Sequence, residues 1–253
     1  MFEVATHVAA LLILAAFVAG FIDSIAGGGG LITVPALLLA GASPVEALAT
    51  NKFQGTFGAG TATLAYARAG HVKPSEQLGM AAISALASAA GALVAHLIPA
   101  EVLRIVMPVV LIGVAAFFAL KPGLSDDARA ERIRPAVFAV TAVPAIAAYD
   151  GFFGPGTGSF FMMGFVLLAG YGVLKATAHT KMLNFASNVG ALLVFIPSGA
   201  MWWGVGLAMA LAQIAGASLG ARLAMRIGAR LIKPLLVFTS TAMALRLLWQ
   251  ALG

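Results

Sequence analysis

Long apolar stretches separated by short polar or glycine-rich breaks run through the whole chain of 253 residues. A helix needs about 20 apolar residues to cross a hydrocarbon core about 30 Å thick. Most of the stretches approach or exceed that length, whereas two are much shorter and each follows a glycine-rich break. The pattern predicts helices over 4–22, 31–40, 47–67, 79–98 and 102–120, and then over 135–149, 159–169, 176–196, 202–219 and 231–252.

The composition assigns these segments to a membrane. Hydrophobic residues make up 61% of the chain and charged residues 9%, whereas soluble domains carry about 25% charged residues. This rules out a soluble enzyme, a disordered protein and, because cysteine is absent, a disulfide scaffold. The net charge of +6 lies mostly between apolar segments, where it orients a chain in the bilayer and offers nucleic acid no binding surface.

The two halves of the sequence repeat each other in order. Asp23, Gly27 and Gly29 recur 127 residues later, and Lys52 recurs 129 residues later as Lys181. The other matched positions are Asp150, Gly154 and Gly156, the pairs Gly41/Gly170 and Ala47/Ala176, and the small-residue rows Ala87/Gly91/Ala95 and Ala212/Gly216/Gly220. We therefore expect a first membrane repeat over 1–120, a linker over 121–134 and a second repeat over 135–253.

The distribution of basic residues predicts that the second repeat is inverted. Each half crosses an odd number of times if its first two segments form one crossing pair or one hairpin, and the second half then enters from the opposite side. On that arrangement eleven of the fifteen basic residues lie on one side, and only Arg104 and Arg246 lie on the other. The eleven are Arg68, Lys73, Lys121, Arg129, Arg132, Arg134, Lys175, Arg222, Arg226, Arg230 and Lys233.

The predicted fold class follows from this asymmetry. We expect an all-α polytopic membrane protein with two inverted-topology repeats, each with a glycine-rich broken helix or hairpin plus three spanning helices. The positive-inside rule places the linker 121–134 in the cytoplasm and both termini on the outer side. Whether the short segments 31–40 and 159–169 cross the membrane or re-enter is left open.

The glycine-rich breaks are the first candidate site. Non-helical backbone survives at membrane depth only where protein or a water-filled cavity covers it. Inverted-repeat transporters place such interrupted helices around a midplane site, where half-helix N-termini face an anion. The alternative is that the glycines only permit tight turns and close helix packing. The candidate ligands in the two breaks are Gly27, Gly28, Gly29, Gly30, Gly156, Thr157, Gly158 and Ser159.

Two lysines at equivalent positions are the second candidate feature. Lys52 and Lys181 each lie inside an apolar segment, and intramembrane charges usually face a cavity or a partner. Asn51, Gln54 and Asn184 accompany them and make a polar cluster in each half. We expect both clusters to line the anion site; the alternative is that the lysines extend to the lipid headgroups.

Asp23 and Asp150 are a third repeated pair. They are candidates for carrying a coupling proton, as is His179, which neighbours Lys181. The alternative for both aspartates is a capping or turn role beside glycine. No histidine spacing indicates a metal site, and no phosphate-binding loop for ATP follows the glycine run. We therefore expect no metal and no cofactor, and a gradient or another subunit as the energy source.

Two stretches carry a likeness to a known family, FIDSIAGGGGLITVPALLLAGASPVEALATNKF in the first half and YDGFFGPGTGSFFMMGFVLLAGYGVLKATAHTKMLNFASN in the second. They resemble the TauE/SafE sulfite exporter family, also called the toluenesulfonate uptake permease family, over nearly the whole chain. The resemblance implies a multi-pass carrier of the bacterial inner membrane that moves sulfite, sulfonates or other organic anions, with export driven by the proton gradient. One departure is that Thr180 stands where the first half has Asn51, so the two half-sites differ chemically.

The expected function is a secondary transporter that exports a small sulfur-containing oxyanion with proton coupling. Its expected partners are a small anionic substrate and the lipid bilayer, without nucleic acid, and a homo-oligomer is left open. One alternative is an uncoupled anion channel or facilitator. The other is an intramembrane enzyme, because the turn from Gly156 to Ser159 is similar to a nucleophile turn, but Phe160 stands where an intramembrane serine protease would have glycine. We expect no enzyme.

Overall fold

The structure is a computed structural model that describes residues 2–99, 132–228 and, between them, 101–103, 105–107, 109–110 and 112–113. The regular elements in these residues are all helical. Most of the predicted segment 102–120, most of the linker 121–134 and the segment 231–252 lie outside the described residues.

The helices follow the predicted order of segments. They are α1 (Thr6–Ala26), α2 (Gly30–Leu39), α3 (Pro44–Arg68), α4 (Pro74–Leu97), α6 (Pro135–Val140), α7 (Ala142–Phe152), α8 (Thr157–Leu167), α9 (Val173–Phe195), the 3-10 turn η1 (Ile196–Ser198) and α10 (Trp203–Ile227). The predicted segment 135–149 is thus two consecutive helices, which meet at Thr141.

The first helix does not stop at Asp23, where the first segment was predicted to end. It continues to Ala26 and ends at Gly27, whose φ of 82° lies in the left-handed region that favours glycine. The Gly27 N–H donates to the Asp23 carbonyl across 2.9 Å. Glycine, rather than the acidic residue, therefore ends the helix.

Among the residues that the structure describes, four stretches are long and apolar enough to cross a membrane: Thr6–Ala26, Pro74–Leu97, Pro135–Phe152 and Trp203–Ile227. The helices α2 and α8 are apolar but short. The helices α3 and α9 are long, yet they bury polar residues, including one lysine each, and pack against each other. The polar pair α3 and α9 is thereby shielded by the more apolar helices α1, α4, α7 and α10.

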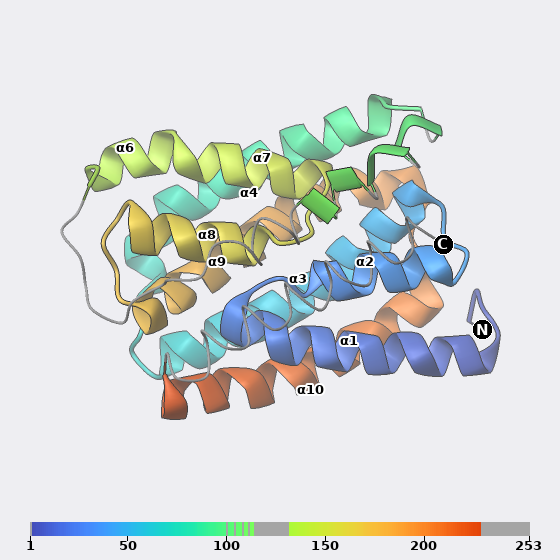
Figure 1. The fold of residues 1–253 in the computed structure, drawn as a ribbon, viewed down its shortest axis with the longest axis horizontal. Coiled ribbons are helices and arrows are strands. Elements are labelled where there is room, and N and C mark those ends of the chain that lie inside the picture. The colour runs from blue at the N-terminus through green and yellow to red at the C-terminus, as the bar shows by residue number, and fades with distance from the viewer. Residues whose placement is uncertain are drawn as a thin grey trace.

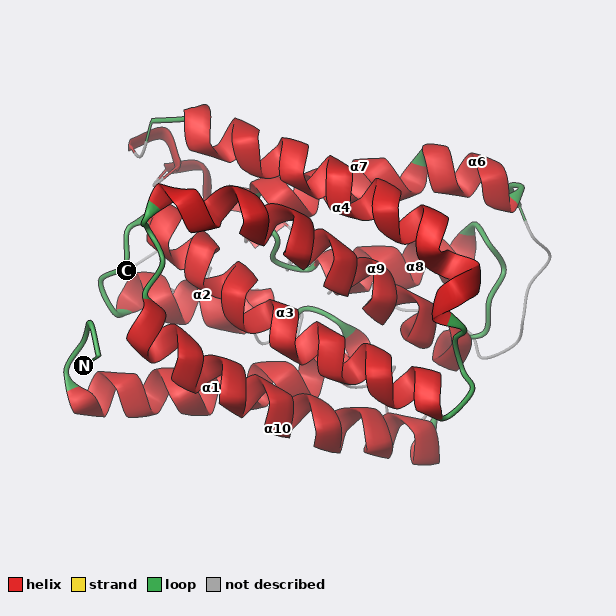
Figure 2. Ribbon diagram, turned by 180° about the vertical axis from the view of Figure 1, so that it is seen from behind, coloured by secondary structure: helices red, strands yellow, loops and turns green. Residues whose placement is uncertain are grey.

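The broken helices form two hairpins that enter the bundle from opposite ends (Figure 1). The helix α1 runs inward from the end where the N-terminus lies, and α2 turns back toward that end; the view from behind shows the same course (Figure 2). The helices α6 and α7 run inward from the other end, and α8 returns to it. This is the course that an inverted repeat would produce, and the repeat itself stays a prediction.

Small residues let the outer helices approach closely, as the repeated small-residue rows predicted. A Cβ atom at Gly91 of α4 would collide with the Ala148 carbonyl of α7, and one at Gly216 of α10 would collide with the Phe17 carbonyl of α1. Close backbone contact through small residues is how helices associate where lipid provides no hydrophobic driving force. These contacts fix α1 and α7, the first arms of the two hairpins.

Candidate functional site

The tips of the two hairpins meet inside the bundle. Gly27 packs directly against Gly158 at the start of α8, and a Cβ atom on either residue would collide with the other tip. The Ser159 hydroxyl donates to the Ala26 carbonyl across 3.0 Å, which links the start of α8 to the end of α1. The second break also turns through glycines in the left-handed region, since Gly154 and Gly156 have φ values of 85° and 86°.

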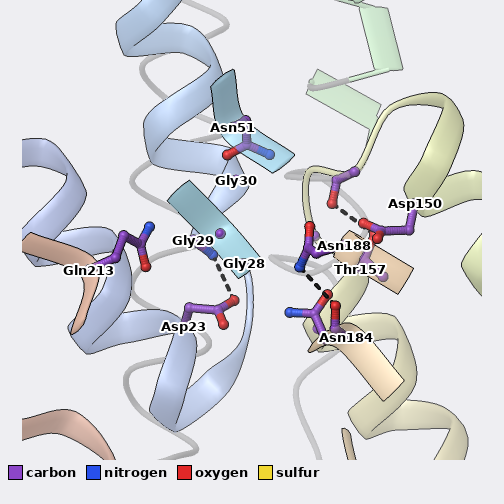
Figure 3. A pocket seen from close by; sticks show the side chains of 14 residues that line it. Asp23, Gly28, Gly29, Gly30, Asn51, Asp150, Thr157, Asn184, Asn188 and Gln213 are labelled. Carbon is purple, nitrogen blue, oxygen red and sulfur yellow. Dashed lines mark hydrogen bonds between the residues drawn. The ribbon is translucent and has the colours of Figure 1, made fainter. Parts of the chain in front are cut away.

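A small polar cavity lies between the tips, with a volume of about 30 Å³, enough for about one or two water molecules. Residues of both halves line it (Figure 3). They are Asp23, Gly28, Gly29, Gly30, Asn51, Gly55, Asp150, Gly154, Gly156, Thr157, Gly158, Asn184, Asn188 and Gln213.

Two buried ion pairs join the halves crosswise behind this cavity. Lys52 Nζ of α3 lies 2.7 Å from Asp150 Oδ1 of α7, and both side chains are at most 2% exposed. Lys181 Nζ of α9 lies 3.3 Å from Asp23 Oδ2 of α1. Each lysine thus pairs with the aspartate of the other half. Such pairing is what makes a charge tolerable inside a membrane protein.

The lysines also face the carboxyl ends of the inward-running helices. The last carbonyls of a helix lack intrahelical partners and form the negative end of its dipole. Lys181 Nζ donates to the Asp23 carbonyl in the last turn of α1. Lys52 Nζ lies beside Gly154, just after α7 ends, where a Cβ atom would be 2.9 Å away. The cations therefore stabilise the ends of α1 and α7, and the amino ends of α2 and α8 face the cavity.

The amino ends of α2 and α8 present free donors. Within the described part of the chain, the backbone N–H groups of Gly28, Gly30 and Gly158 donate no hydrogen bond. The neighbouring Gly29 N–H is already occupied, since it donates to Asp23 Oδ1 across 3.1 Å. Free N–H groups at two helix N-termini around one enclosed space are the arrangement that binds anions.

Most of the predicted site residues come together here. Those that line the cavity are Asp23, Gly28, Gly29, Gly30, Asn51, Asp150, Gly156, Thr157, Gly158 and Asn184. Those that lie one contact behind its wall are Gly27, Lys52, Gln54, Ser159 and Lys181. His179 is apart from both groups, since its ring contacts Phe165 and Tyr171, with ring centroids 5.6 and 5.0 Å apart.

Two side chains of the cavity were not among the predicted ligands. Asn188 lies one turn after Asn184 on α9, and its Nδ2 donates to the Asn184 carbonyl across 2.8 Å. Gln213 lies on α10 and is 4% exposed. A polar residue in an apolar helix is the signal that could have found Gln213. The glycines Gly55 and Gly154 also line the cavity. No group of three or more acidic or histidine side chains able to hold a metal occurs among the residues that the structure describes.

An all-helical membrane protein with two broken helices around an enclosed polar cavity has the architecture of a membrane transporter. The profile of the family described as Sulfite exporter TauE/SafE matches residues 12–247, and the chain belongs to this family.

Its relatives are named as membrane transporters, and the matches cover nearly the whole length of each. A probable membrane transporter protein ORF9 of Sinorhizobium sp is 58% identical over 248 residues, which cover 98% of this chain and 95% of the relative. The probable membrane transporter protein YfcA of Escherichia coli strain K12 is 43% identical over 253 residues, 100% of this chain and 94% of the relative. A probable membrane transporter protein of Haemophilus influenzae is 38% identical over 248 residues, 98% of this chain and 97% of the relative. No solved structure matches the chain.

Proposed function

We propose that this transporter is a secondary carrier that exports a small sulfur-containing oxyanion, such as sulfite or an organosulfonate, across the bacterial inner membrane with proton coupling. The observation that carries the proposal is the convergence of the free N–H groups of Gly28, Gly30 and Gly158 on one buried cavity. The family name, which is that of a sulfite exporter, supports the substrate class and the direction.

The geometry gives the polar residues separate roles in this proposal. The anion accepts hydrogen bonds from the helix N-termini and from Asn51 and Asn184, which line the cavity. Lys52 and Lys181 act as counter-ions of Asp150 and Asp23, so that the wall behind the donors is neutral overall. Neutral donors at fixed positions bind an oxyanion without the large energetic cost of an unpaired buried charge.

The two aspartates are the coupling residues in this proposal. Asp23 and Asp150 both line the cavity, and Asp150 Oδ2 has no hydrogen-bond partner among the described residues. His179, the third candidate, does not line the cavity. A protonatable carboxyl group at the substrate site is the usual element of proton-coupled transport.

The test is transport by the purified protein in proteoliposomes. We expect flux of labelled sulfite, and a panel of sulfite, sulfoacetate, taurine and thiosulfate ranks the substrates. Asn51→Leu should reduce flux strongly, whereas Leu64→Ala on the exposed face of the same helix should leave it unchanged. Failure of the wild-type protein to bind or move any of these anions would refute the proposal. Flux that persists unchanged after the pH gradient is collapsed would instead favour the uncoupled channel.

A further inference from the structure

Three buried amide side chains form a chain of hydrogen bonds that runs from α10 to Asn51, with each bond donated in the same direction. Gln213 Nε2 donates to Gln54 Oε1 across 2.8 Å, and Gln54 Nε2 donates to Asn51 Oδ1 across 3.1 Å. The three residues are 4%, 0% and 7% exposed. Gln54, in the middle, therefore accepts a hydrogen bond from Gln213 on its oxygen and donates one to Asn51 from its nitrogen.

The chain of amides fixes which end of Asn51 faces the cavity. Asn51 Oδ1 is occupied twice, because the Thr33 hydroxyl also donates to it across 2.6 Å. The Asn51 nitrogen has no acceptor among the described residues, and a Cβ atom at Gly30 would lie 3.5 Å from it. Figure 3 shows this nitrogen turned toward the side of the pocket that carries Asp150 and Thr157. Asn51 thus offers the cavity a donor beside the amino end of α2.

The far end of the chain is held by a slot in the packing of three helices. A Cβ atom at Gly20 of α1 would lie 2.8 Å from Gln213 Oε1, and one at Gly58 of α3 would collide with the same oxygen. The Gln213 oxygen therefore occupies space that only glycine leaves open, and the nitrogen of the same amide faces Gln54. The chain of hydrogen bonds begins at this slot.

The chain of amides is not repeated in the other half of the molecule. The positions 129 residues after Asn51 and Gln54 hold Thr180 and Leu183, neither of which has an amide. The two sides of the cavity therefore differ in the donors they present, although the backbone breaks repeat.

We propose that Gln213 and Gln54 are positioning residues that hold the Asn51 amide as a hydrogen-bond donor toward the transported anion. The inference rests on the proposed function, since it needs an anion in the cavity. Removing a hydrogen bond to a charged group costs about 1.5–3 kcal/mol, or about ten-fold or more in affinity. The donor direction set at Gln213 is accordingly a determinant of affinity and selectivity for oxyanions.

Two buried glutamines separate this role from a structural one. Gln54→Met adds no charge, but the side chain no longer donates to Asn51 Oδ1, so the Asn51 amide is free to turn its oxygen toward the cavity. We expect sulfite binding to weaken about ten-fold or more. Gln77→Met removes an equally buried amide, which donates to the His179 carbonyl and does not line the cavity, and we expect affinity within about three-fold of wild type.

The measurement is labelled-sulfite binding to detergent-purified protein, with thermal melting to show that each variant is folded. Unchanged affinity of Gln54→Met, or equal weakening by Gln77→Met, would overturn the inference while the wild-type binding still upholds the proposed function. Absence of sulfite binding in the wild type would overturn both. If Gln54→Met does not fold, Gln213→Met serves instead, because it removes the donor that holds the Gln54 oxygen; unchanged affinity there would equally refute the inference.

Discussion

At the scale of single residues, the buried charges of this transporter occur as pairs of a lysine and an aspartate. Lys52 and Lys181 were expected to meet a substrate directly, and the structure places each against an aspartate of the other half. A buried charge is expensive, and a partner at hydrogen-bonding distance removes most of that cost. The two lysines therefore stabilise the folded site by neutralising the two aspartates.

Removal of one member of a pair tests this dependence. Lys52→Met leaves the Asp150 carboxylate without its counter-ion, and we expect the free energy of unfolding to fall by about 3–5 kcal/mol. The double substitution Lys52→Met with Asp150→Asn removes both charges and should recover most of that loss. Thermal and denaturant unfolding of the detergent-purified proteins give the measurement.

The exposed pair of Lys73 and Glu76 provides the control. Both side chains are about 70% exposed, and water screens the attraction between exposed charges. Lys73→Met should therefore leave the melting temperature close to that of the wild type. A Lys52→Met protein as stable as wild type would contradict the assignment of Lys52 as a counter-ion.

At the scale of elements, glycine decides where helices end and how closely they lie. Gly27 and Gly156 turn the chain at the two breaks with positive φ values, whereas Gly91 and Gly151 bring α4 and α7 into backbone contact. The same residue type thus has two physical uses. Only the first of them creates the free donors of the cavity.

Two glycines of α4 distinguish the effect of close helix packing on stability from the effect of helix propensity. A Cβ atom at Gly91 would collide with the Ala148 carbonyl, while nothing lies within 4 Å of one at Gly79. Gly91→Ala should destabilise the protein by about 1–3 kcal/mol. Gly79→Ala should leave it unchanged or stabilise it by up to about 1 kcal/mol. Melting temperatures of the two variants compare them directly, and equal effects would argue against the close packing of α4 on α7.

The amino end of α10 is capped from a distance by Glu3. Its carboxylate accepts from the Gly204 and Val205 N–H groups across 2.8 and 3.0 Å. Partial burial alone would raise the pKa of Glu3, but these backbone hydrogen bonds outweigh it and hold the pKa below the ordinary 4.5. A lowered pKa means that the contribution to stability is present above about pH 4.5 and is lost as the pH falls through the lower, folded-state value.

Glu3→Gln tests the cap. A charge at a helix N-terminus contributes about 0.3–1 kcal/mol, so the variant should melt slightly below wild type at neutral pH. The difference should shrink below about pH 4.5, where the wild-type carboxyl loses its charge. A difference that stays constant from neutral pH down to pH 3 would contradict the role of the carboxylate.

At the scale of the whole molecule, the two hairpins enter from opposite ends and basic residues gather at one of them. The helices that end or begin at the left of Figure 1 carry Arg68, Arg134, Lys175, Arg222 and Arg226 in their first or last two turns or at their caps. The positive-inside rule predicts that this end faces the cytoplasm. The N-terminus lies at the other end.

Cysteine labelling tests this orientation, since the chain contains no cysteine of its own. Ser75 begins α4 at the basic end and is exposed, and Pro197 lies in the exposed turn between α9 and α10 at the other end. In intact cells a membrane-impermeant maleimide should label Pro197→Cys at once and Ser75→Cys only after permeabilisation. The reverse pattern would place both termini in the cytoplasm.

The sequence predicted the helices, and the residues that lie around the candidate cavity, better than the contacts between them. Periodic apolar segments and glycine breaks located α1 to α4 and α6 to α10, because composition and length decide which segments can lie in a bilayer. The repeat also identified Asp23, Asp150, Lys52 and Lys181 as related positions. Their crosswise pairing could not be predicted, because it depends on how α3 meets α7 and α9 meets α1 in three dimensions.

Gln213 shows a second limit of prediction from the sequence. Its counterpart 125 residues earlier is Ser88, so no repeated motif marks it, and its role depends on the space left by Gly20 and Gly58 on two other helices. The end of α1 shows a third limit, since Asp23 interrupts the apolar pattern although the helix continues to Ala26. Polarity and helix termination are separate properties at this position.

The crosswise pairing of Lys52 with Asp150 and Lys181 with Asp23 has a consequence for biosynthesis. When the first half leaves the ribosome, Lys52 and Asp23 have no partners, because Asp150 and Lys181 have not yet been translated. The first half therefore enters the bilayer with two unpaired charges, and these charges find their partners only when the second half is inserted.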